Sequence, residues 1–279
     1  MFLRFKSLAS LICLVLSVAS AQAGTDSATA EALMRKSGLW NQLSGFAPQI
    51  RAGFIAAAST SKQGMSTQEA ERIAKVIDSA YSSERLRTAS LKVFAAELDE
   101  ARISPLTRWF DGPLGKKIAK LDIAASEDIS DPREQISQGE DLLRSMPKAR
   151  RAEIEAFVRA SHVAELMAEM SIETSVAVVE GVASSAPGAS RTPARDLRKM
   201  IQAQRPQMEA GLNAMSAAVY ARAYNSLSIE EIKRYVRFLK SDAGRHLNAA
   251  GTKAVSAAMR EGATELGRML YRTKDKANT

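Results

Sequence analysis

The sequence predicts an all-α fold made of two related multi-helix halves, each built around a tight helical hairpin. Three observations predict it. Apolar residues recur at helical spacing along nearly the whole chain, and no run of alternating β-branched residues interrupts them. Good helix formers dominate the composition. Pairs of residues that start helices are frequent.

The chain begins with a segment typical of a secretory leader. Arg4 and Lys6 precede the apolar run 8–18, and Ala21-Gln22-Ala23 forms a small-x-small cleavage site. The run is shorter than the roughly 20 residues of a membrane span. We therefore expect an exported, periplasmic protein, cleaved after Ala23, with no transmembrane span afterwards.

Cleavage would remove the single cysteine, Cys13, with the leader. The mature chain would then have neither thiol chemistry nor cysteine-ligated metals. Removing Arg4 and Lys6 from the 39 basic residues leaves 37 against 31 acidic ones, a net charge of +6. We expect no nucleic-acid partner, because basic residues are not clustered among aromatics. An envelope component, either a protein or an anionic lipid, is the expected partner.

Helix starts follow one another along the chain. Ser66 and Ser228 each stand three residues before a glutamate, which is the spacing of a capping box. Asp131-Pro132 and Thr192-Pro193 each place a capping residue before a proline at the first helical position. The stretch 183–191, ASSAPGASR, is predicted to be a loop.

A helix that carries Ile229, Ile232, Val236 and Leu239 on one face is predicted to end near Lys240. Ser241 can cap the next helix, whose first turn contains Asp242 and Gly244. Glycine here costs up to about 1 kcal/mol of helix propensity, so a packing reason is expected. Gly244, Gly251 and Ala258 recur every seven residues and predict a seam that a neighbouring helix approaches closely.

The same corner occurs earlier in the chain. Residues 108–118 align with 237–247 at an offset of 129, so that Trp109 matches Phe238 and Gly115 matches Gly244. Residues near 32–39 align with 156–163 at an offset of 124. These alignments predict a leader at 1–23, a first half at 24–126, a connecting helix or linker at 127–147 and a second half at 148–279.

The corner residues resemble an exported bacterial family known only as domain of unknown function 2059. Its signature is a capped helix reading roughly Leu-Ser-x-Glu-Glu-Leu, then an aromatic residue and Ser-Pro-x-Gly. The second half matches it well, with Asp242 in place of proline, and the first half less well. The resemblance implies helices and export, and it implies no activity. The structural signature residues are Trp109, Gly115, Ser228, Glu231, Phe238, Ser241 and Gly244.

The sequence predicts no catalytic residue, cofactor or metal site. His162 and His246 are the only histidines, and neither has a second histidine three or four residues later. The preferred function is non-enzymatic binding or scaffolding in the cell envelope. One alternative is a carrier or sensor of an apolar or amphipathic anionic ligand, held in an aromatic-lined groove by Arg108, Tyr235 and Arg237. A third hypothesis is a peptidoglycan hydrolase that uses a single glutamate.

Overall fold

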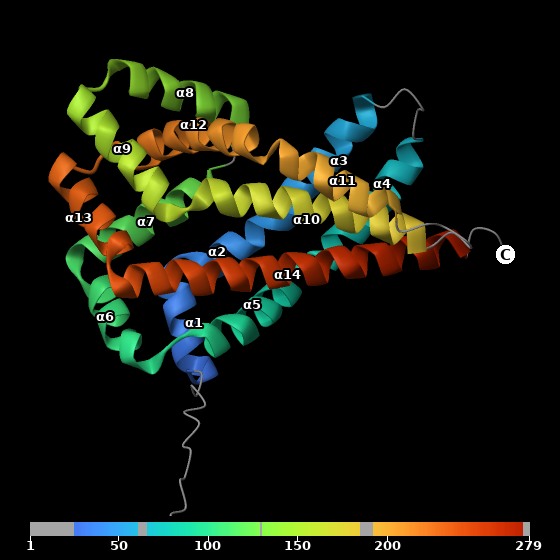
Figure 1. Cartoon of the computed structure of the whole chain (residues 1–279), viewed down its shortest axis with the longest axis horizontal. Helices are drawn as coiled ribbons and strands as arrows, with labels where there is room; N and C mark the ends of the chain where they lie inside the picture. The colour runs from blue at the N-terminus through green and yellow to red at the C-terminus, as the bar shows by residue number, and fades with distance from the viewer. Residues whose placement is uncertain (1–24, 61–65, 129, 185–191, 276–279) are drawn as a thin grey trace, which may run out of the picture.

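The computed structural model describes residues 25–60, 66–128, 130–184 and 192–275, and these residues contain helices and no strand, which confirms the all-α prediction (Figure 1). The helices are α1 (Ser27–Lys36), α2 (Leu39–Gln42), the 3₁₀ turn η1 (Leu43–Gly45), α3 (Phe46–Thr60), α4 (Thr67–Ala80), α5 (Ser83–Glu97), α6 (Glu100–Asp111), α7 (Pro113–Glu127), α8 (Pro132–Ser145), α9 (Lys148–Ser161), α10 (Val163–Ser184), α11 (Thr192–Ala203), α12 (Arg205–Ala223), α13 (Ile229–Lys240) and α14 (Asp242–Asp275).

Several predicted boundaries agree with the helix ends. At Ser228 both bonds of the predicted capping box are present, and at Ser66 the hydroxyl accepts from the Glu69 N–H. Asp131 caps α8, with Pro132 at its first position. The predicted loop 183–191 is partly wrong, because α10 continues to Ser184. Its remaining residues, and the whole predicted leader, lie outside the described part.

The two corners have the same local geometry. Helices α6 and α13 have identical bounds at an offset of 129, and so do the first residues of α7 and α14. The corner residues also match, with φ −69° and ψ 158° at Gly112 against φ −70° and ψ 164° at Ser241. The two corners therefore have matching backbone geometry, and their origin as copies of one repeat stays a prediction.

A second correspondence follows the offset of 124. The buried residues Ala30, Leu33 and Met34 of α1 fall on Ile154, Phe157 and Val158 of α9. Each helix ends before a left-handed residue, Gly38 at φ 80° and His162 at φ 53°, and these are the two positive φ values within the described ranges. That the halves are related along their full length stays a prediction.

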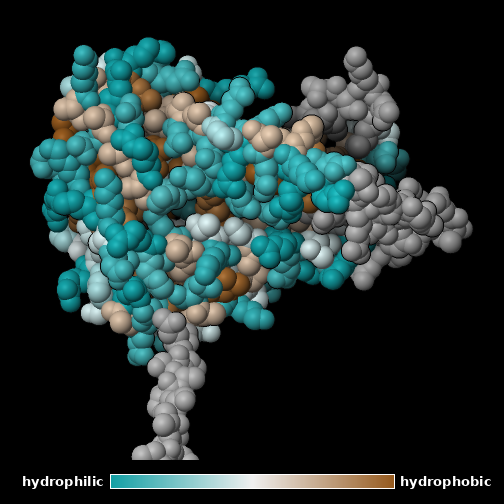
Figure 2. All heavy atoms as spheres, in the orientation of Figure 1, coloured by the Kyte–Doolittle hydropathy of each residue, from teal (hydrophilic) through white to brown (hydrophobic). Residues whose placement is uncertain are grey.

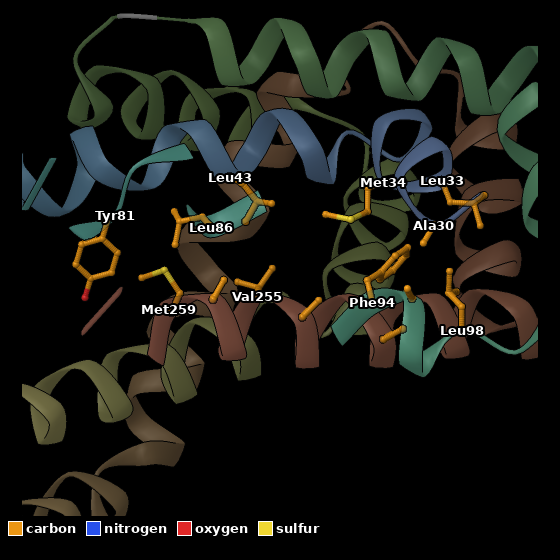
Figure 3. Close-up of a cluster of buried hydrophobic side chains, with 14 of the residues drawn as sticks. Ala30, Leu33, Met34, Leu43, Tyr81, Leu86, Phe94, Leu98, Val255 and Met259 are labelled. Carbon is orange, nitrogen blue, oxygen red and sulfur yellow. The ribbon is translucent and has the colours of Figure 1, made fainter. Parts of the chain in front are cut away.

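The buried residues form two main clusters, and each cluster takes a helix from the other half. The first cluster joins α1, α4, α5 and α6 to Val255, Met259 and neighbouring alanines of α14. In Figure 3 the side chains of Phe94, Leu86 and Met34 lie in one layer with Val255 and Met259 of α14. The second cluster joins α9, α12 and α13 to Leu114 and Ile118 of α7. The halves are thus interlocked through α7 and α14.

Candidate functional site

The glycines of the two corners lie against the helix that precedes them. A Cβ at Gly115 would stand 2.2 Å from the Trp109 carbonyl oxygen, and one at Gly244 would stand 2.0 Å from that of Phe238. The predicted glycine–alanine seam is wrong at Gly251, because a Cβ there would meet nothing within 4 Å. The close approach of Gly244 is made at the corner, and farther along α14 a Cβ at Gly262 would stand 2.6 Å from the ring of Tyr81.

The caps complete these corners. The Ser241 hydroxyl accepts from the Gly244 N–H at 3.1 Å, as predicted for a helix cap. Glu231 accepts from the backbone N–H of Ser228 and also receives the Lys117 ammonium at 2.8 Å. The hydrogen bonds from Lys117 and Ser228 lower the pKa of Glu231. Since Lys117 belongs to α7, this pair also ties one corner to the other.

The first corner lacks the capping glutamate and uses a residue from the other half instead. At the position equivalent to Glu231 stands Arg102, which pairs with Asp99 and with Asp242 of α14. The part-buried backbone N–H of Asp99 donates to His246 Nε2 at 3.1 Å. His246 is thus a trans cap for α6. The other histidine, His162, is exposed, and its Nδ1 lies 3.4 Å from Oε1 of Glu165.

The aromatic signature residues meet between the corners. Trp109 stacks on Phe238 at a centroid distance of 4.1 Å and on Tyr235 at 5.9 Å. Phe157 packs against Tyr235 at 4.9 Å and against the ring of Tyr220 at 4.8 Å. These rings fill the space between the corners by contacting one another.

The aromatic groove with two arginines at its mouth stays a prediction, and the structure places its three expected ligand contacts as follows. Arg108 lines a surface groove of about 630 Å³ between α1 and α6, together with Asp26 and Glu100. Arg237 is exposed on α13, where its charge helps to lower the pKa of Glu230. Tyr235 lies in the aromatic cluster, and burial raises its pKa well above the usual value. The structure thus places these three residues in different surroundings.

The aromatic cluster contains one carboxyl group that was not predicted. Asp122 of α7 accepts a hydrogen bond from the Tyr224 hydroxyl at 2.6 Å. Burial raises the pKa of Asp122 to about 6, although the bond from Tyr224 acts in the opposite direction. The sequence held a signal for this residue, since Leu114, Ile118 and Asp122 continue one face of a helix at intervals of four. Such a perturbed carboxyl is a recognised marker of function.

Arg150 is a second residue that was not predicted. Its guanidinium donates to the carbonyl oxygens of Leu227 at 2.6 Å, and of Tyr224 and Asn225 at 3.0 Å each. These carbonyls follow the last turn of α12, and that of Tyr224 also accepts from the Leu227 N–H at 3.0 Å. Arg150 therefore holds the loop that leads into α13.

Within the described ranges, no group of three or more His, Cys, Asp or Glu side chains is arranged to hold a metal ion. In the same part of the chain, no helix has the length and apolarity needed to cross a membrane. No family model, curated protein or solved structure matches this chain. The resemblance to domain of unknown function 2059 stays a prediction.

Proposed function

We propose that this chain is an exported, non-enzymatic protein that binds or scaffolds another protein in the cell envelope. The observation that carries the proposal is a pair of helical arms, each with an exposed large apolar side chain. The first arm is α3–α4 and the second arm is α10–α11.

The two arms lie at the same end of the molecule, where α14 also ends (Figure 1). Helix α14 packs against both α4 and α10. Ile55 on the first arm is 48% exposed and Met200 on the second arm is 58% exposed. On the face seen in Figure 2, apolar residues otherwise form small groups within a mostly hydrophilic surface. Exposed large apolar side chains suit a protein partner, and methionine is enriched in such interfaces.

The charges on the arms favour a protein over an anionic lipid. Arg195 and Lys199 are exposed on α11, while Glu69 and Glu71 are exposed on α4. An anionic membrane would attract the first pair and repel the second. A protein surface can complement both signs.

The proposed cleavage after Ala23 is compatible with the first contacts of the described chain. The Thr25 N–H donates to the Ala95 carbonyl oxygen at 2.9 Å, and the Thr25 hydroxyl donates to that of Leu98. Cleavage after Ala23 would leave these bonds in place. N-terminal sequencing of the protein recovered from its own cells should begin at Gly24, whereas an intact leader would contradict export.

Cross-linking in intact cells tests the partner. An Ile55→Lys/Met200→Lys double variant should lose the proteins that cross-link to the wild type. Val219→Lys is the matched control, because Val219 is exposed by 36% on α12, outside both arms. An unchanged cross-linking pattern in the double variant would contradict the proposal.

A sedimentation assay with phosphatidylglycerol vesicles distinguishes the lipid alternative. We expect no binding of the purified full-length protein. Binding that disappears in the double variant would make the arms a lipid-binding surface. The carrier alternative has no comparable support, since the groove beside Arg108 also contains the carboxyl groups of Asp26 and Glu100.

A further inference from the structure

Helix α7 belongs to the first predicted half, but its buried side chains lie in the second hydrophobic cluster. Leu114 and Ile118 are 5% and 3% exposed within the second cluster. Asp122 follows one turn later on the same face and reaches Tyr224, the residue at the end of α12. A carboxyl group therefore lies where the helical spacing calls for an apolar side chain.

The surroundings of Asp122 provide a hydrogen-bond donor without a countercharge. The titratable groups that face it are the hydroxyls of Tyr220 and Tyr224 on α12 and of Tyr235 on α13. The junction before α2 contributes Gly38, whose position faces the Asp122 Cβ. No lysine, arginine or histidine of the described part pairs with this carboxyl group. Burying a carboxylate without a cation is costly, whereas the neutral acid is tolerated.

A second acid just after α7 shows the opposite arrangement. Asp128 accepts hydrogen bonds from Ser130 and pairs with Arg222 of α12. The bonds from Ser130, with help from Arg222, lower the pKa of Asp128 to about 2. Asp122 and Asp128 thus both connect α7 to the end of α12. The anion of Asp128 is stabilised by hydrogen bonds and an arginine, whereas Asp122 has no cation beside it.

We propose that the docking of α7 onto α12 is linked to proton uptake by Asp122. Protonation of its carboxyl group at low pH strengthens the contact between the two helices, and deprotonation weakens it. The interlocked fold makes α7 the part through which such a change would pass from one half to the other. The inference does not depend on the identity of any partner.

The direction of the effect follows from the two states of the carboxyl group. Its pKa rises from 3.8 in the unfolded chain to about 6 in the fold. The stabilising contribution is fully present below about pH 4 and is lost as the pH rises through about 6. A difference of about two pKa units corresponds to about a hundredfold change in an opening equilibrium over the full pH range, and part of it is already lost at pH 4.5, so on the order of tenfold is expected between pH 4.5 and 7.5.

Hydrogen exchange of α7 amides in the full-length protein tests the proposal, with rates corrected for the intrinsic effect of pH. Protection in the wild type should fall about tenfold between pH 4.5 and 7.5. Asp122→Asn keeps an acceptor for Tyr224 and should remove this dependence. Asp128→Asn is the matched control. It should lower the protection of the α7 amides at every pH and keep the pH dependence of that protection. The same dependence in Asp122→Asn, or its loss in Asp128→Asn alone, would overturn the proposal.

A second measurement needs no variant. The ¹³C chemical shift of the Asp122 carboxyl carbon in the wild-type protein should titrate with a midpoint near pH 6. A midpoint near pH 4 would overturn the proposal.

Discussion

The indole of Trp109 lies flat on the ring of Phe238, with centroids 4.1 Å apart and an angle of 2° between the planes. The two residues occupy equivalent positions in the repeated corner, at the offset of 129. A residue of one corner thus packs on its own counterpart in the other. Phe238 also packs against both buried clusters, so this stack lies where they join.

Trp109→Ala should destabilise the protein. Replacing a large aromatic side chain in a core with alanine lowers the free energy of unfolding by about 3–5 kcal/mol. Because Trp109 is half-buried, its loss should lie at the lower end of that range. Urea unfolding measures the loss. Trp109→Phe preserves a flat ring and should cost clearly less. Equal losses for the two variants would show that stacking contributes nothing specific.

Alanine should have opposite effects at two glycines of α14. Gly244→Ala places a Cβ against the Phe238 carbonyl and should destabilise the protein by at least 1 kcal/mol, because α13 must move. Gly251→Ala meets no atom within 4 Å and should stabilise it by about 0.5–1 kcal/mol through helix propensity. Thermal unfolding of the two variants measures both effects. The same sign at both positions would contradict the corner explanation.

Arg150→Ala should remove the guanidinium donor of three carbonyl groups after the end of α12, of which that of Tyr224 keeps the Leu227 N–H. A loss on the order of 2 kcal/mol is expected, since hydrogen bonds to charged groups contribute about 1.5–3 kcal/mol and these groups retain some access to water. Chemical denaturation measures the loss. Arg159→Ala is the control, because Arg159 is exposed on the same helix. Similar losses for both variants would mean that the loop contacts are unimportant.

The interlocked cores predict a single cooperative unfolding transition. Ile118→Ala in α7 should lower hydrogen-exchange protection in α9 and α12, and Val255→Ala in α14 should lower it in α1 and α5. Each substitution should cost about 1–4 kcal/mol, because each removes buried methyl groups. Calorimetry should show one transition in every case. Two separate transitions would indicate that each half is stable without the helix from the other.

Much of the local structure could be predicted because its causes lie within a few residues. Ser228 and Glu231 interact across one helical turn, so their spacing alone indicates the capping box. The corner at Ser241 and Gly244 is similarly local, and its second copy was visible as an alignment. The helical class follows from the spacing of apolar residues, which depends on the helix period and not on distant partners.

The candidate site was predicted less well, because a ligand groove and a packed cluster require the same residue types. Trp109, Tyr235 and Phe238 suit both, and only their mutual contacts distinguish the two. Arg108 and Arg237 are equivalent in sequence, yet their neighbours come from different helices. Asp122 was overlooked because its importance depends on Tyr224, which lies 102 residues away.

The sequence by itself determined the helices, their caps and the two corners, since these depend on backbone hydrogen bonds and side-chain spacing within one or two turns. Only the tertiary structure decided which helices share a core. Helix α7 buries Leu114 and Ile118 beside residues of α9, α12 and α13, whereas α14 buries Val255 and Met259 beside residues of α1, α4 and α5. The Trp109–Phe238 stack and the bond from Asp99 to His246 join residues more than 125 positions apart, and spacing within one helix carries no information on such distant contacts.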